Sequence, residues 1–130
     1  MLNHTMIGSN NIQRTKTFYD AVLGVLGAGP AMEHVNDTGQ TRLFYIHDGS
    51  TFGISEPING EPATVANGAT VGFICNSPEQ LQEFHDAAIA NGGTTSEDPP
   101  GVREGSMGTM YLCYFLDPDG HKICGIHRPA

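Results

Sequence analysis

Two stretches of the chain place apolar side chains three or four residues apart, which is the spacing of an amphipathic helix. Asn10 or Asn11 can cap the first stretch, and a group of glycines ends it. Ser77-Pro78 opens the second, with proline at the first helical position. The apolar stripes are Ile12, Phe18, Val22 and Leu26 in the first helix, and Leu81, Phe84, Ala88 and Ile89 in the second. The pattern therefore predicts two helices, each with one buried face.

Short runs rich in β-branched and aromatic residues surround both helices and end in turn residues, as strands do. The expected strands cover residues 4–9, 31–35, 41–46 and 51–56, and then 69–75, 94–97, 110–116 and 121–127. We therefore expect an α+β fold, with two tandem βαβββ modules whose curled mixed sheets surround a concave cavity. The whole chain, 1–130, is expected to form a single domain, with module one at about 1–62 and module two at about 68–130.

An internal repeat supports this reading. An offset of 66 residues gives five identities within 18 positions, and an offset of 71 aligns the ends of the two halves. The identical pairs at the first offset are Asn10 and Asn76, Phe18 and Phe84, Asp20 and Asp86, Ala21 and Ala87, and Gly27 and Gly93. The second offset pairs Phe44 with Phe115, Asp48 with Asp119, and Gly49 with Gly120. Module two therefore carries five extra residues, which we place in the Pro- and Gly-rich stretch 98–108.

Net charge and composition limit the kinds of molecule that the protein is expected to bind. The formal net charge is −8, from six Lys and Arg against 14 Asp and Glu, so nucleic acid and anionic membranes are not expected to bind. No apolar run is long enough to span a membrane, and the N-terminus lacks a secretory pattern, so we expect a cytoplasmic protein. Cys75, Cys113 and Cys124 lie in strand-like runs without zinc or redox spacing, and are expected to be buried reduced thiols.

Several motifs resemble those of the vicinal oxygen chelate superfamily, which includes glyoxalases, bleomycin-resistance proteins and extradiol dioxygenases. The first-helix sequence 17–24 and the turn Asp117-Pro118-Asp119-Gly120 with 121–123 carry the resemblance. Residues 83–88, 91–93 and 99–103 are similar to a bacterial glyoxalase-like branch. The resemblance implies a small-molecule ligand and a homodimer. It leaves the reaction open, because this fold hosts lyases, epimerases, dioxygenases and drug-binding proteins.

The same resemblance implies four metal-ligand positions, on the first and last strands of each half. Here they hold His4, Gly53, Thr70 and Cys124. Glycine offers no donor and threonine a weak one, so no metal or other cofactor is expected. A divalent ion such as Zn, Ni, Mn or Fe would have only His4 and Cys124 as weak candidate ligands. Glu56, three residues beyond Gly53, is expected to leave the opposite face of its strand unless a bulge intervenes.

Strand alternation sorts the remaining side chains into two faces. A helix-covered face should hold Ile7, Phe52, Ile54, Val71, Phe73, Cys75 and Ile123. The cavity face should hold His4, Met6, Gly8, Gly53, Ser55, Thr70, Gly72, Ile74, Asn76, Cys124 and Ile126, a set that suits an uncharged ligand. The candidate ligand-binding residues are His4, Tyr45, Ser55, Thr70, Ile74, Arg103, Tyr111, Tyr114 and Cys124. For the three tyrosines, a place in the core or in a dimer interface is the alternative.

The insertion around residues 103–108 is a candidate mobile lid, because its glycines permit hinge motion. Arg103 in this segment could hold a carboxylate or phosphate by two contacts. The alternative is a solvated loop arginine that pairs with Glu97 or Glu104.

These observations favour a small-molecule-binding protein with a degenerate metal site and a ligand held between the two modules. One alternative is a metal-dependent lyase or isomerase similar to lactoylglutathione lyase, or a dioxygenase, for which His4 or Glu56 would be the weak candidate catalytic base. Another is a dimeric scaffold without a ligand.

Overall fold

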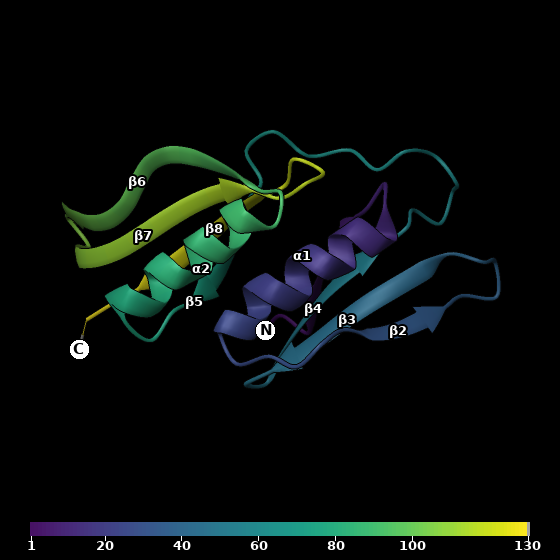
Figure 1. Cartoon of the computed structure of the whole chain (residues 1–130), viewed down its shortest axis with the longest axis horizontal. Coiled ribbons are helices and arrows are strands. Elements are labelled where there is room, and N and C mark those ends of the chain that lie inside the picture. The colour runs from purple at the N-terminus through teal and green to yellow at the C-terminus, as the bar shows by residue number, and fades with distance from the viewer. Residues whose placement is uncertain (130) are drawn as a thin grey trace.

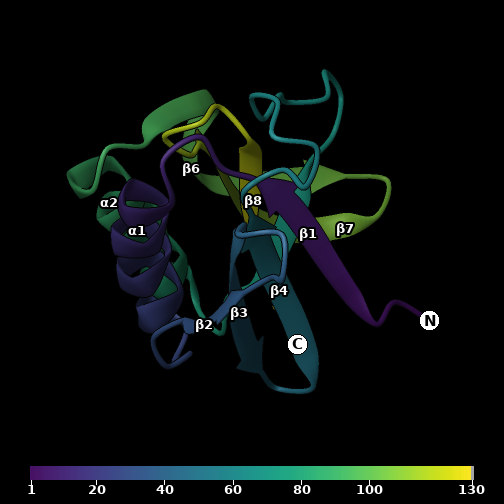
Figure 2. The ribbon, with the colours of Figure 1, turned by 90° about the vertical axis from the view of Figure 1, so that its right-hand side faces the viewer.

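Two helices pack side by side on one side of the molecule, and the strands of two sheets form the other side (Figures 1 and 2). The computed structural model describes residues 1–129, and neither helix in that range is long and apolar enough to cross a membrane. In chain order the elements are β1 (His4–Gly8), α1 (Ile12–Val25), β2 (Met32–Val35), β3 (Thr41–His47), β4 (Ser50–Ser55), β5 (Val71–Ile74), α2 (Pro78–Ala90), β6 (Thr94–Gly105), β7 (Gly108–Leu116) and β8 (Lys122–His127). The predicted α+β fold of two tandem βαβββ modules is confirmed.

Each module contributes one mixed four-stranded sheet. The strand orders are β1-β4-β3-β2 and β5-β8-β7-β6. In each sheet the first and last strands of the module are parallel, and the other neighbours are antiparallel. The two sheets are not closed into a barrel, so the face that carries no helix is open in the single chain (Figure 2).

Strand register confirms the internal repeat for the first and last strands of each half. Thr5 lies opposite Phe52 in the β1–β4 pair, and Val71 lies opposite Ile123 in the β5–β8 pair. These two pairs are related by the offsets of 66 and 71 residues. The helices obey the first offset as well, because α1 begins at Ile12 and α2 at Pro78.

The predicted match of Phe44 with Phe115 is wrong. Phe44 lies opposite Gly53 and lines the open face. Phe115, by contrast, lies opposite Ile123 and is buried in the core.

The five extra residues of module two lengthen a hairpin and do not form a loop. β6 runs from Thr94 to Gly105 with a shift of register between Ser96 and Gly101, and only two residues separate it from β7. The prediction of a short strand followed by a lid loop was therefore wrong. Proline and glycine suggested a loop, but β6 is an edge strand, where prolines cost no ladder hydrogen bond and a bulge is tolerated.

A closed ring of six aromatic side chains joins the two modules. Successive ring centroids lie 4.8 to 6.1 Å apart around the circuit. The members are Phe18, Tyr19, Phe52, Phe73, Phe84 and Phe115, three from each module. The predicted helix-covered face is confirmed, because all seven of its residues belong to this core or pack against it. The two modules therefore share one core.

The turn between β7 and β8 holds α1 in place across the module boundary. The carboxylate of Asp119 accepts hydrogen bonds from the Asn10 amide at 3.2 Å, from Arg14 Nη2 at 2.8 Å and from the Thr15 hydroxyl at 3.2 Å. Its side chain is only 3% exposed. One buried carboxylate of module two thus satisfies donors at the start of the module-one helix.

Asp117 extends the same contact. Tyr19 Oη donates to Asp117 Oδ2 at 2.6 Å, and the amides of Asp119 and His121 donate to Oδ1. His121 Nε2 lies 2.8 Å from the Gly8 carbonyl, so it donates there. Burial raises the pKa of Tyr19 well above its usual value, which keeps the phenol a hydrogen-bond donor. Burial also raises the pKa of Asp117, against the opposing effect of these hydrogen bonds.

Asp119→Ala should lower the free energy of unfolding by about 2–3 kcal/mol, because it leaves the Asn10 amide and the Arg14 guanidinium without their buried acceptor. Urea unfolding followed by far-UV circular dichroism measures the change. Glu83→Ala removes the same charge from an exposed position on α2 and should stay within about 0.5 kcal/mol of the parent. Equal stability of the two variants would refute the role of Asp119.

Candidate functional site

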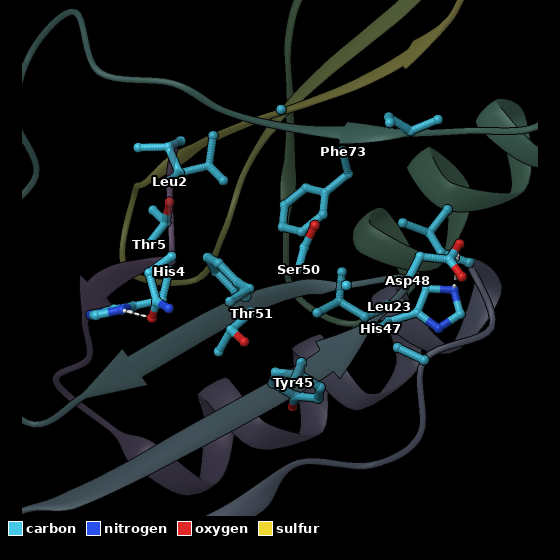
Figure 3. Close-up of a pocket in the computed structure, with 18 of the residues that line it drawn as sticks. Leu2, His4, Thr5, Leu23, Tyr45, His47, Asp48, Ser50, Thr51 and Phe73 are labelled. Carbon is cyan, nitrogen blue, oxygen red and sulfur yellow. Dashed lines mark hydrogen bonds and ion pairs between the residues drawn. The ribbon is translucent and has the colours of Figure 1, made fainter.

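A cleft of about 360 Å³ lies where module one meets β5 (Figure 3). Its floor is apolar and aromatic, from Leu23, Tyr45, Phe52 and Phe73, and the Phe73 ring points into the space. We call this space the inter-module cleft. Its other lining residues are Leu2, Asn3, His4, Thr5, Leu26, Ala28, His47, Asp48, Gly49, Ser50, Thr51, Val71, Gly72, Ile74 and Asn76. An apolar floor with a polar rim is the usual form of a small-molecule site.

A second space, of about 660 Å³, lies on the face of the first sheet that carries no helix. We call it the module-one hollow. It is lined by Asn3, His4, Met6, Ile7, Gly8, Arg42, Phe44, Thr51, Ser55, Pro57 and Ile58. Asn3, His4 and Thr51 line both spaces, so the hollow and the cleft adjoin at the start of β1.

The predicted ligand-binding residues divide between the modules. His4, Tyr45 and Ile74 line the inter-module cleft, and His4 with Ser55 lines the module-one hollow. Tyr45 is 3% exposed and its hydroxyl donates to Asp20 at 2.7 Å, so it contributes its ring to the floor. Thr70 is exposed, lies just before β5 and lines neither space.

The other four predicted residues lie on the second sheet, outside the cleft and the hollow. Tyr114 and Cys124 are cross-strand neighbours on the open face of the sheet. Tyr111 is on the helix side, with its ring 5.9 Å from that of His127. Arg103 donates to the carbonyls of Pro99, at 2.9 Å, and Asp98, at 3.2 Å.

Neither predicted acidic partner of Arg103 takes that role. Glu97 instead forms an ion pair with Lys122. The Arg103 guanidinium bonds only to backbone carbonyls of its own hairpin. Its contacts therefore stabilise the bulged segment of β6.

The residues at the four metal-ligand positions do not fit a divalent ion. His4 Nδ1 is 2.9 Å from Asn3 Oδ1, and a Cβ atom at Gly53 would collide with Met6 Sδ, so no larger side chain can enter there without displacing Met6. Burial raises the pKa of the Cys124 thiol, which disfavours the thiolate that metals bind. Within residues 1–129, no three His, Cys, Asp or Glu side chains are grouped to hold a metal.

The candidate base Glu56 is held by the backbone. Its Oε1 accepts from the Thr41 amide at 2.8 Å, and its own amide donates to the Thr41 carbonyl at 3.0 Å. The carboxylate thus closes the end of the β3–β4 ladder.

Sequence reasoning missed several residues of the hollow, among them Arg42 and Phe44 on β3. Strand alternation was applied only to the first and last strands of each half. The signal was present in β3, where buried Leu43 and Tyr45 alternate with Arg42 and Phe44. Extending the alternation to this strand would have placed one cation and one aromatic ring on the open face.

Residues 1–124 match the family model of the Glyoxalase/Bleomycin resistance protein/Dioxygenase superfamily. The chain belongs to this superfamily. It is 54% identical to a glyoxalase/bleomycin resistance protein from Albidiferax ferrireducens, with a TM-score of 0.90 over 98% of this chain and 99% of that one. No protein of curated function matches the sequence.

More distant superfamily structures share the fold. The fosfomycin resistance protein FosX from Listeria monocytogenes is 18% identical, with a TM-score of 0.69 over 100% of this chain and 92% of that one. A variant of glyoxalase I from Zea mays is 16% identical, with a TM-score of 0.75 over 97% of this chain and 45% of that chain. At such identities the likeness shows the fold alone.

The three thiols of this superfamily member should be unreactive while it is folded. Burial raises the pKa of Cys75 to about 11 and that of Cys113 to about 12, and it also raises that of Cys124. At pH 8 a colorimetric disulfide reagent should modify all three rapidly in denaturant and none rapidly in the native protein. Fast native modification of Cys124, located by mass spectrometry, would contradict this prediction.

Proposed function

We propose that the protein binds a small organic molecule in the inter-module cleft and the adjoining module-one hollow, without using a bound metal ion. The observation that carries the proposal is an aromatic-floored space, lined by both modules, together with four metal-ligand positions of which Gly53 has no donor and Thr70 a weak one. Both volumes lie within the range of sites for small ligands. The aromatic floor favours a ligand with an apolar ring, and the hydroxyl and amide groups of the rim favour a polar end.

We further propose that a second copy of the chain covers the open sheet faces. Apolar side chains on these faces are exposed to an extent that is unusual for a monomer, with Ile74 79%, Ile46 59% and Met32 55% exposed. A two-fold interface would bury them and would enclose the module-one hollow. The three free, buried cysteines support a reducing, cytoplasmic setting.

The metal-dependent lyase, isomerase or dioxygenase stays a prediction that no specific observation favours. The carboxylate of Glu56 is hydrogen-bonded to the backbone, and His4 is hydrogen-bonded to Asn3. Gly53 has no donor and no room for one.

Val71→Phe should narrow the cleft, because Val71 lines it on the helix side and a phenyl ring would occupy part of its volume. We expect 2-naphthylmethanol, 2-naphthylmethylamine or 2-naphthoate to shift amide resonances of residues 51 and 71–73 saturably in NMR titrations. The variant should weaken that binding at least about tenfold. Val35→Phe, at a position 61% exposed on β2, is the matched control. The proposal fails if no probe binds, or if both variants bind like the parent.

Metal removal should leave binding of the same probes unchanged. The protein is dialysed with Zn, Ni, Mn or Fe salts, freed of loose ions and assayed by plasma mass spectrometry, and the titrations are then repeated with EDTA. We expect far less than one ion per chain, since two weak ligands do not make a stable site. Stoichiometric metal, or loss of binding with EDTA, would overturn the metal-free part of the proposal.

A further inference from the structure

Arg42 is a half-buried cation without a partner in the part of the chain that the structure describes. Its Nε is buried and has no hydrogen-bond acceptor. It takes part in none of the ion pairs among residues 1–129. A buried N–H without an acceptor is costly, so its retention calls for an explanation.

The module-one hollow around Arg42 holds no carboxylate. None of its lining residues is Asp or Glu, although acidic residues outnumber Lys and Arg by 14 to six in the whole chain. The two acidic residues nearest along the strands lie elsewhere. Glu33 is opposite Leu43 in the β2–β3 pair, and the Glu56 carboxylate binds the Thr41 amide. Arg42 is therefore the one formally charged side chain of this hollow.

The cross-strand neighbours of Arg42 cannot neutralise it either. It lies opposite Ser55 on β4 and His34 on β2. The Ser55 hydroxyl donates to the Glu56 carbonyl. Arg42 thus lines a space with apolar walls from Met6 and Phe44 and has no negative charge beside it.

We propose that Arg42 anchors the ligand through a carboxylate, so that the protein binds a small acid with an apolar ring; this rests on the proposed function. The planar guanidinium can hold both oxygens of a carboxylate in two parallel hydrogen bonds from its two terminal nitrogens, for which the described residues provide no acceptor. The adjoining cleft takes the ring, because the hollow and the cleft meet at His4 and Thr51.

The overall negative charge does not exclude such a ligand. At physiological ionic strength, charges on the far side of the molecule act through a screening length of about 8 Å. The attraction between Arg42 and a bound carboxylate acts at hydrogen-bond distance, within this screening length. The negative surface would slow the approach of an acid, whereas the Arg42 contact would slow its release.

The test compares three probes with the same ring, 2-naphthoate, 2-naphthylmethanol and 2-naphthylmethylamine, by NMR titration of the full chain. We expect naphthoate to bind tightest and its affinity to fall as salt is raised. Arg42→Gln should weaken naphthoate about 10- to 100-fold while leaving naphthylmethanol unchanged. Arg42→Lys keeps the charge but loses the two-point geometry, so its affinity for naphthoate should lie between that of the parent and that of Arg42→Gln. Arg128→Gln removes the same charge from an exposed position and should bind like the parent.

Each other outcome has a distinct meaning. If naphthylmethanol binds as tightly as naphthoate, or Arg42→Gln weakens both alike, the assignment of Arg42 is overturned and the proposed function stands. If no probe binds, the proposed function itself fails. If native mass spectrometry shows that Arg42→Gln separates a dimer into monomers, the missing acceptor belongs to a second copy and the assignment is again overturned. If Arg42→Gln does not fold, the assignment is tested with the parent and Arg42→Lys. It then depends on the order in which the parent binds the three probes, on the salt dependence of naphthoate binding, and on weaker naphthoate binding by Arg42→Lys.

Discussion

The contact between α1 and the turn that joins β7 to β8 is the constraint on which the rest of the structure depends. Asp119 reaches across the module boundary and accepts hydrogen bonds from three groups at the start of that helix, and Asp117 accepts from Tyr19. With α1 fixed there, its aromatic side chains meet those of module two and complete the six-membered aromatic ring. Both helices therefore lie on one side of the sheets, and the open sheet faces lie on the other.

Much of this arrangement could be predicted from the sequence, because the internal repeat shows which positions of the two halves have the same structural role. Two offsets, 66 and 71, specify which residues of the two halves are equivalent, so that the β1–β4 pairing of one sheet recurs as the β5–β8 pairing of the other. Alternation along the strands then separates core from open face. The long β6–β7 hairpin could not be predicted in this way, since an edge strand tolerates the prolines and the bulge that elsewhere mark a loop. Arg42 was missed for a different reason, which is that its strand was left out of the alternation.

The site was harder to predict because its parts depend on how the sheets are placed. His4 and Tyr45 were both predicted to bind the ligand, and both line the inter-module cleft, whereas Arg103, Tyr111, Tyr114 and Cys124 lie outside it on the second sheet. The space above Gly53 is taken by Met6, a flexible residue whose position no pattern in the sequence reports. The net charge of the chain is equally insufficient to predict the ligand. A strongly acidic chain suggests neutral or cationic ligands, whereas the local environment of one arginine favours an acid.

The shared aromatic ring also bears on how such a chain can evolve. Each half supplies three of its six members, so a change at any of them alters the packing of both halves at once. The open faces are under no such restriction, because a side chain exchanged at His4 or Thr70 alters no core contact. The shared core thus restricts substitution in the interior, whereas the open faces can change their binding chemistry, which explains how one architecture can serve unrelated ligands.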